Sequence, residues 1–278
     1  MYKIAIIWWT WRFWQFWKKY FEERGNEVIT TGRTSPISNE QAIKIADIII
    51  ISVSIRNTDK VIDELVPLIQ KWKLLMDFTW IKLSSVKKMK KYKGWEVIWT
   101  HPMFWPNVPS LKNQNIAFDP VKKWSKWEYI YNLWKNDWAN LIEMTAKRHD
   151  ELIWIIQPTT HFLNFIFWYV LKKKWVHPEE LIAISTPVSR MQTYIFSRFL
   201  WQQAWLYWDM QICNDTYKKD ILPLINRKTK KLTKIIQNWD FEMFENEFED
   251  LKAFIWNDFL EKAMSMSSKI DNMLKEEK

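Results

Sequence analysis

Glycine is nearly missing from this chain, which contains 3 Gly and 22 Trp among 278 residues. An average content of about 7% would give roughly 19 glycines. Such a shortage excludes a fold with many tight turns of positive φ, unless another residue stands at those turns. Cysteine is equally scarce, since Cys213 is the only one in the sequence. A single cysteine excludes an internal disulfide and indicates a reducing compartment, so we expect a cytoplasmic protein.

Long apolar runs and a targeting signal are also absent. The longest apolar run, 162–171, is interrupted by Asn164, so no segment reaches the length of a transmembrane helix. The N-terminus has a strand pattern and no signal peptide. We therefore expect a soluble protein with no membrane partner. The net charge of +9 comes from dispersed lysines, a pattern typical of solvated helix surfaces, so we expect no nucleic-acid partner.

Tryptophan stands where glycine is expected. The cluster Trp8–Trp14 directly follows the apolar run Tyr2–Ile7. Within it, Trp9, Trp11 and Trp14 have the spacing of the dinucleotide-binding fingerprint G-x-G-x-x-G. The three glycines of that fingerprint make the tight turn, admit the pyrophosphate and let the helix pack on the strand. An indole ring can do none of these.

Two interpretations of the tryptophan excess are open. In the first, the protein is rich in aromatic residues and some of its turns are unusual. In the second, which we favour, most of these positions are glycines encoded by UGA, a codon that some lineages reassign to glycine and others to tryptophan. Turn-like polar contexts support the second interpretation at Trp72, Trp138 and Trp239. Local context identifies three positions as genuine tryptophans: Trp17, Trp127 and Trp134.

The first half of the chain alternates between strand and helix patterns. Short apolar runs separated by amphipathic stretches are typical of a parallel sheet with helices on both faces. From residue 146 the pattern is helical, with breaks only near 177–178, 185–187 and 205. We predict an α/β Rossmann-type doubly wound parallel sheet over 1–150, followed by an all-α helical domain over 151–278. Strands are predicted over 2–7, 27–31, 48–53, 74–78, 115–118 and 140–144, and helices over 12–24, 39–46, 58–68 and 126–136.

The end of the second predicted strand indicates which cofactor binds. An acidic residue there would bind the ribose 2′-hydroxyl of NAD, whereas an arginine suits the additional phosphate of NADP. Arg33 lies at about the expected spacing from Trp9, so we predict NADP, with NAD as the alternative. Arg33 could also be an ordinary exposed arginine of a loop. The predicted cofactor contacts are Trp9, Thr10, Trp11, Arg12, Phe13, Trp14, Gly32, Arg33, Ser52 and Val53.

One histidine and two arginines are candidates for chemistry. His101 follows a strand pattern and opens a Pro-containing segment, at the sheet edge where ligands of such folds bind. An imidazole can transfer a proton near neutral pH, although a lone histidine can equally be structural. Arg190 and Arg198 can face one side of a helix among apolar residues. Such a pair is either a solvated stripe or a binding site for a dicarboxylate substrate.

With these motifs in place, the chain resembles the prephenate dehydrogenase family of tyrosine biosynthesis over essentially its full length. The most specific match is Thr100–Pro106 together with the arginine-bearing helix. Further matches lie at 9–14, 31–33, 77–82, 149–150, 157–162 and 185–187. The resemblance implies oxidative decarboxylation of prephenate to 4-hydroxyphenylpyruvate, with hydride transfer to NAD(P). It also implies that no metal is needed and that the helical domain binds substrate and forms a homodimer.

The resemblance also implies a role for each matching residue. His101 would accept the proton of the substrate's ring hydroxyl, and Arg198 would bind the ring carboxylate. Many relatives have a serine at the position of Trp80, close to the catalytic histidine, so we expect Thr79 or a water to take its part. The implied substrate contacts are Arg198, Arg190, His161, Gln202, Tyr207 and Thr79.

Two alternative functions are open. An arogenate dehydrogenase would share the fold and the hydride chemistry, but its substrate has an amino group on the side chain. A non-catalytic protein that keeps the nucleotide-binding fold is the other alternative. It applies if the tryptophans are genuine, because indoles in the fingerprint would block the pyrophosphate.

Overall fold

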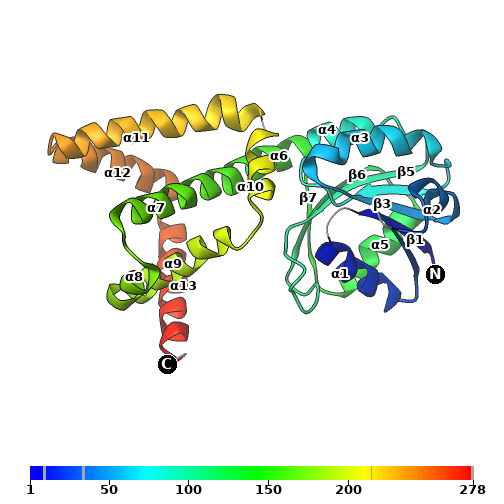
Figure 1. Ribbon diagram of the computed structural model, residues 1–278, viewed down its shortest axis with the longest axis horizontal. Helices are drawn as coiled ribbons and strands as arrows, with labels where there is room; N and C mark the ends of the chain where they lie inside the picture. Colours follow the sequence, from blue (N-terminus) through cyan, green and yellow to red (C-terminus); the bar gives the residue numbers. More distant parts are fainter. Residues whose placement is uncertain (9–10, 33–34, 214, 277–278) are drawn as a thin grey trace. The chain divides into compact units, whose positions relative to one another are not determined.

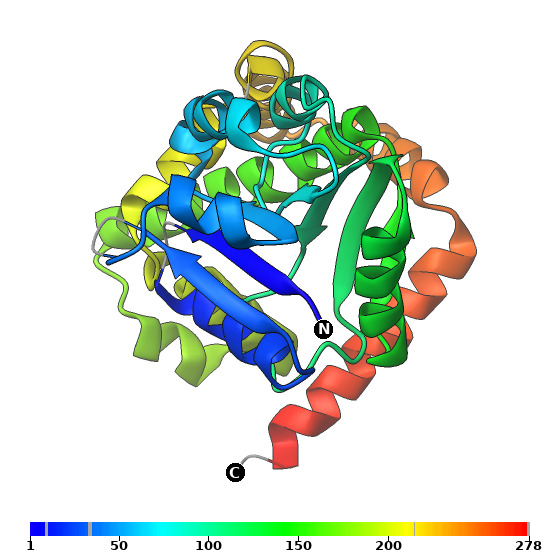
Figure 2. The same ribbon diagram turned by 90° about the vertical axis from the view of Figure 1, so that its right-hand side faces the viewer.

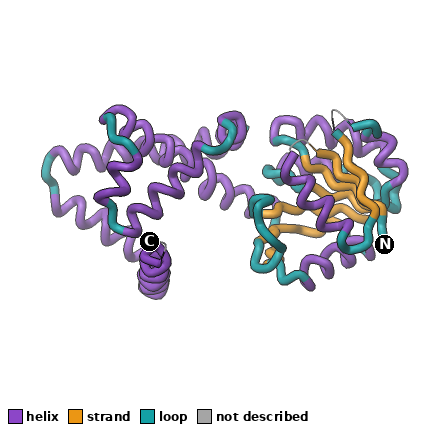
Figure 3. Tube along the Cα trace, turned by 60° about the horizontal axis from the view of Figure 1, so that its bottom comes forward, coloured by secondary structure: helices purple, strands orange, loops and turns teal. Residues whose placement is uncertain are grey.

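The protein, represented by a computed structural model, is described over residues 1–8, 11–32, 35–213 and 215–276. It divides into two compact units, Met1–Ile153 and Trp154–Lys278. Strands occur in the first unit and the second is helical, as Figure 3 shows. Within the described residues, no helix is both long enough and apolar enough to cross a membrane.

The first unit is built on a seven-stranded sheet of order β2-β1-β3-β4-β5-β6-β7 in its described part (Figure 1). Because β1 lies between β2 and β3, the chain winds first to one side and then to the other. This topology confirms the predicted Rossmann-type, doubly wound α/β fold. The strands are β1 (Lys3–Trp8), β2 (Glu27–Thr31), β3 (Ile48–Ser52), β4 (Leu74–Asp77), β5 (Glu96–Pro102), β6 (Asn115–Lys122) and β7 (Asn140–Glu143).

The sheet is not wholly parallel, which corrects the prediction. Strands β1 to β5 are parallel, but β6 runs antiparallel to β5, and β7 is parallel to β6. A parallel connection requires a crossover, usually a helix. The segment 103–114 is described throughout and forms no helix, so the chain turns back beside β5 instead.

Helices cover both faces of the sheet, as Figure 2 shows. One face packs against α1 and α5, and the other against α2, α3 and α4. Since both faces are covered, β3 is a continuous run of buried isoleucines. Helix α4 was not predicted, because its lysine-rich sequence has little apolar periodicity. The bounds are α1 (Trp11–Glu22), α2 (Asn39–Ile45), α3 (Ile55–Leu65), α4 (Leu83–Met89) and α5 (Ser125–Asn136).

The described part of the second unit consists of helices and two π-helical turns, Ile155–Thr159 and Tyr217–Ile221. Predicted breaks near 177–178 and 185–187 coincide with helix ends, whereas the ends at 238–240 and at Trp256 were not predicted. At the former, the Asp240 carboxylate accepts a hydrogen bond from the Met243 N–H and so begins a new helix. The helices are α6 (Ala146–Trp154), which starts in the first unit, α7 (Thr160–Lys174), α8 (Pro178–Ile184), α9 (Pro187–Leu200), α10 (Ala204–Ile212), α11 (Leu222–Gln237), α12 (Phe241–Ile255) and α13 (Asn257–Glu276).

Tryptophan occupies backbone conformations that favour glycine. Of the five non-glycine residues with positive φ in the described residues, four are tryptophans, with φ between 51° and 60°. Left-handed backbone costs an ordinary residue about 1–2 kcal/mol. Trp175 takes this conformation directly after α7, the helix-capping position where glycine is strongly preferred. The four are Trp138, Trp175, Trp239 and Trp256, and all are exposed.

Replacing Trp239 by glycine should stabilise the helical unit by about 1 kcal/mol, since the change relieves a φ of 54° and removes a side chain that is 92% exposed. Denaturant unfolding of the two proteins measures this difference. Trp201 provides a matched control, because it is 82% exposed but has an ordinary φ of −70°. Equal stabilisation by Trp201→Gly would show that backbone strain is not the cause.

Candidate active site

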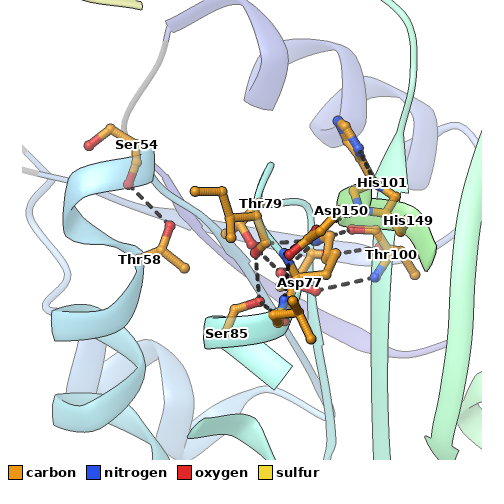
Figure 4. A network of polar contacts seen from close by, with 12 residues as sticks. Ser54, Thr58, Asp77, Thr79, Ser85, Thr100, His101, His149 and Asp150 are labelled. Atoms are coloured by element: carbon orange, nitrogen blue, oxygen red, sulfur yellow. Dashed lines mark hydrogen bonds and ion pairs between the residues drawn. The ribbon is translucent and has the colours of Figure 1, made fainter. Parts of the chain in front are cut away.

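A cluster of buried polar side chains lies at the carboxyl ends of β4 and β5 (Figure 4). Asp77 is the last residue of β4, and His101 is the next-to-last residue of β5. The two strands are parallel neighbours, so their ends meet at the edge where ligands of doubly wound folds bind. Two further elements of the first unit complete the cluster, with Lys82 just before α4 and His149 in α6.

A buried ion pair stabilises the loop between β4 and α4. The Lys82 Nζ lies 2.8 Å from the Asp77 Oδ2, and both side chains have 0% exposure. The same Nζ donates to the Thr100 carbonyl at 2.6 Å, which joins the loop to β5. Burial lowers the pKa of Lys82, and the Asp77 carboxylate opposes that shift. Removing either partner would leave a buried charge unpaired, so the pair fixes this part of the sheet edge.

His101 contacts a second buried histidine. Its Nδ1 lies 2.8 Å from Nε2 of His149, and Nδ1 of His149 lies 2.8 Å from Oδ1 of Asp150. The Asp150 carboxylate also accepts hydrogen bonds from the backbone N–H groups of Lys82, at 2.9 Å, and Leu83, at 2.8 Å. The start of α4 therefore holds Asp150 in place, and Asp150 in turn orients the two rings.

The electrostatics of the cluster favour a neutral His101. Burial lowers the pKa of His101 well below 6.5, and the neighbouring His149 and Lys82 lower it further. Burial also lowers the pKa of His149, against the hydrogen bond to Asp150, which raises it. An imidazole that is neutral at pH 7 has a lone pair on one ring nitrogen. His101 can therefore act as a proton acceptor.

Thr79 does not contact His101 through any hydrogen bond of the described site. The Thr79 hydroxyl donates instead to the Asp77 carboxylate. The Lys82 Nζ lies 3.4 Å from the Thr79 Oγ1. The ring of His101 is held by His149, to which the sequence assigned no role. The signal for this partner was present in the sequence, because His149-Asp150 is an adjacent polar pair at the start of a helical pattern.

The predicted cofactor residues lie along the carboxyl ends of β1, β2 and β3. Register places Ile7 beside Thr31 and Trp8 beside Ser52, so these three strand ends are adjacent. Gly32 directly follows β2, Val53 directly follows β3, and Phe13 and Trp14 are half-buried in α1. The side chains of Trp11 and Arg12 are not described, and three predicted contacts lie outside the described residues: Trp9, Thr10 and Arg33.

In the helical unit, three aromatic rings from three helices converge. The ring centroid of His161 in α7 lies 4.5 Å from that of Tyr207 in α10. Phe199 in α9 lies 5.6 Å from His161 and 4.3 Å from Tyr207. Burial lowers the pKa of His161 to about 4 and raises that of Tyr207, against the charge of Arg198. Four predicted substrate residues belong to this part of the helical unit. His161 lies in α7, Arg198 in α9 and Tyr207 in α10, and Gln202 lies between α9 and α10.

Arg190 lies two turns before Arg198 in α9, and its Nε is buried without a hydrogen-bond partner among the residues that the structure describes. A buried guanidinium nitrogen in this state suits an anionic partner. The described residues contain no group of three His, Cys, Asp or Glu side chains that could hold a metal ion.

Comparison with protein families and curated proteins supports the resemblance noted in the sequence. Residues 24–143 match the model of the family "Prephenate dehydrogenase, nucleotide-binding domain". The chain is 32% identical over 260 residues to a Methanocaldococcus jannaschii protein named "Probable arogenate/prephenate dehydrogenase". That alignment covers 87% of this chain but only 58% of the relative, so the chain spans little more than half of that protein. The T-protein of Haemophilus influenzae is 23% identical over 97% of this chain and 71% of its own length.

Solved structures show the same fold. Prephenate dehydrogenase from Aquifex aeolicus, in complex with hydroxyphenyl propionate and NAD+, superposes with a TM-score of 0.66 at 14% identity. The match covers 91% of this chain and 96% of that one. Synechocystis arogenate dehydrogenase superposes with a TM-score of 0.61 at 13% identity, over 89% and 96% of the two chains. At these identities the likeness shows the fold alone: a Rossmann-type α/β domain followed by helices.

Proposed function

We propose that this protein is an NAD(P)-dependent prephenate dehydrogenase, which oxidatively decarboxylates prephenate to 4-hydroxyphenylpyruvate. One observation carries the proposal: a buried histidine with a lowered pKa, held by a second histidine, stands at the ligand-binding edge of a Rossmann-type sheet. The match of residues 24–143 to the nucleotide-binding domain of this family supports the assignment.

In this proposal His101 takes the proton of the substrate's ring hydroxyl. A bound nicotinamide would accept the hydride from the same ring carbon. The guanidinium of Arg198 binds the ring carboxylate, which is lost as carbon dioxide because the ring becomes aromatic. The other residues proposed to contact the substrate are His161, Gln202 and Tyr207. Arg190 and Thr79 are proposed to support this substrate site. A proton acceptor that is uncharged at neutral pH and a cation for the carboxylate are the two groups that such chemistry needs from the protein.

The fold suits a dinucleotide at the ends of β1 to β3. The strand order reverses at β1. Helix α1 begins at Trp11, the next described residue after β1 ends at Trp8, and its first turn contains no acidic residue. Free N–H groups at such a helix end bind a pyrophosphate. We propose NADP as the preferred cofactor, with Arg33 bound to its additional phosphate, and NAD as the alternative.

The proposal applies to the chain with glycine in the nucleotide loop. We propose that UGA is read as glycine at Trp9, Trp11 and Trp14 and at the other tryptophans in glycine-like contexts. Support comes from the four tryptophans of positive φ, a conformation that glycine adopts without strain. Sequencing the gene decides the matter, because a UGG codon at these positions specifies tryptophan.

Steady-state assays with both substrates and both cofactors test the function. Prephenate with NADP should give reduced nicotinamide and carbon dioxide in equal amounts. Arogenate dehydrogenase is the second candidate, since the Methanocaldococcus relative is named "Probable arogenate/prephenate dehydrogenase", after both substrates. A clear preference for arogenate would favour it. Absence of turnover with either substrate, in the glycine-containing protein, would contradict both assignments.

The organisation of the chain belongs to the same proposal. We propose that residues 1–150 bind the nucleotide and that residues 151–278 bind substrate and form a homodimer. The apolar side chains exposed on α7 and α9, such as Phe165, Tyr169 and Ile195, offer a surface for a second copy. The single cysteine supports a cytoplasmic location.

A further inference from the structure

His101 is the first member of a row of three buried side chains, and the proposed chemistry uses only that member. The row continues through His149 to Asp150, with 2.8 Å between successive partners (Figure 4). The three residues are 7%, 1% and 0% exposed. Buried polar atoms are almost always hydrogen-bonded, so the positions of the hydrogens on these rings are set by the row itself.

Asp150 determines which atom donates in each hydrogen bond of the row. An ionised carboxylate only accepts hydrogen bonds, so Nδ1 of His149 must donate to it. A neutral imidazole with its hydrogen on Nδ1 has a lone pair on Nε2. Nε2 of His149 therefore accepts a hydrogen bond from Nδ1 of His101. In consequence, Nε2 of His101 carries no hydrogen and is the nitrogen that can receive one.

We propose that His149, oriented by Asp150, is a positioning residue that holds His101 in the Nδ1–H tautomer and so makes Nε2 its basic atom. Thr79, the residue expected near His101, is engaged by Asp77. The kinetic consequence rests on the proposed dehydrogenase function. The tautomer is a property of the protein without substrate, so it can be tested separately.

Each bond that breaks as the substrate hydroxyl proton moves is matched by a bond that forms. The O–H bond of the substrate hydroxyl breaks, and an N–H bond forms at Nε2 of His101. The resulting imidazolium keeps its Nδ1–H bond to His149, whose partner Asp150 supplies the compensating negative charge. When the carboxylate has left as carbon dioxide, the phenolate oxygen takes the proton back from Nε2.

The charges around the row are consistent with this role. Lys82 and Asp77 face the two histidines, and they form a buried ion pair with each other. Lys82 disfavours a second positive charge on either histidine, whereas Asp150 and Asp77 favour one on His149. Before the reaction both rings are therefore neutral, as the direction of the hydrogen bonds requires.

Two-bond ¹H–¹⁵N NMR of the protein labelled at histidine measures the tautomer directly, and the chain contains only 4 histidines to assign. We expect an Nδ1–H, Nε2-unprotonated His101, and a shift toward the Nε2–H form in His149→Ala. His177→Ala serves as the control, because His177 is exposed and lies in the helical unit. An Nε2–H tautomer of His101 in the unaltered protein would overturn the inference.

The kinetics distinguish positioning from simple structural support. His149→Ala should lower kcat by about 100-fold with little change in KM, since a wrong histidine tautomer can cost up to about 10⁴-fold. His149→Gln can still accept the Nδ1–H bond through Oε1 and should stay within about tenfold of the unaltered protein. Equal losses in both variants, with the His101 tautomer unchanged, would refute the role of His149. These rates are compared in the protein with glycine at Trp9, Trp11 and Trp14. If that protein turns over neither substrate, the proposed function fails and the NMR result alone decides this inference.

Discussion

In the protein with glycine in the nucleotide loop, replacing His101 by asparagine should lower kcat for prephenate by about 10³-fold or more and leave NADP binding nearly unchanged. Removal of a general base typically costs about 10²–10⁴-fold. Asparagine can keep a hydrogen bond to His149 but cannot accept a proton at neutral pH. The ring lies at the end of β5, whereas the proposed cofactor residues lie at the ends of β1 to β3. Steady-state kinetics and a fluorescence titration with NADP measure the two effects.

The exposed His177 provides the control for this substitution, because His177→Asn changes the same side chain outside the first unit. It should leave kcat within about twofold of the unaltered protein, as surface substitutions usually do. Full activity in His101→Asn would remove His101 from its role. Loss of NADP binding in the same variant would show that the substitution disturbs the nucleotide site instead.

The pH dependence follows from the direction of the His101 shift. Its pKa lies well below 6.5, so the neutral, proton-accepting form persists as the pH falls through that value. The acid limb of kcat/KM should therefore lie below pH 6.5, because this profile reports the free enzyme's essential groups. An acid limb at or above pH 6.5 would mean that another group titrates or that His101 is less buried in solution.

Much of the fold could be predicted because its strands are buried on both faces. Runs such as residues 48–51 are apolar throughout and stand between amphipathic helices, a pattern typical of a covered parallel sheet. The reversed direction of β6 could not be predicted, since strand direction depends on pairing and leaves no local mark on Asn115–Lys122. Helix α4 was missed for a similar reason, because tertiary contacts bury Val86 and Met89 in a lysine-rich segment.

The candidate site could be predicted only in part. His101 was identified from its place at a strand end, which is a local property. Its partner His149 is 48 residues later in the chain, and the contact exists because α6 returns to the carboxyl edge of the sheet. Lys82 and Asp77 likewise pair through a loop whose course the sequence does not reveal. Sequence patterns thus identify which side chains can do chemistry, whereas packing determines which of them contact one another.

Neither burial nor backbone conformation alone separates the tryptophans into the two expected classes. Trp17, Trp127 and Trp134, expected to be genuine, lie in the core beside the sheet. Trp99, which is not one of the three expected genuine tryptophans, is also fully buried, and its indole N–H has no hydrogen-bond partner in the described part of the chain. Burial alone therefore does not distinguish the two classes. A positive φ is the more direct sign of a glycine position, but among the described tryptophans it marks only four: Trp138, Trp175, Trp239 and Trp256.

Restoring glycine at Trp9, Trp11 and Trp14 together should create NADP binding that the tryptophan-containing chain lacks. A bulky ring at any of these positions keeps the backbone N–H groups away from the pyrophosphate. Each lost hydrogen bond to a charged group costs about 1.5–3 kcal/mol, so loss of two lowers affinity by on the order of 100-fold or more. Titration of both proteins with NADP and with NAD measures the difference.

A second set of substitutions shows whether the effect belongs to the loop. Glycine at Trp175, Trp239 and Trp256 relieves backbone strain in the helical unit but leaves the nucleotide loop unaltered. This variant should become more stable without binding NADP more tightly. Equal affinity of the loop variant and the tryptophan-containing chain would refute the steric argument. The same titration also tests whether the reaction requires glycine in the loop. The reaction at His101 can proceed only if a cofactor is bound to accept the hydride.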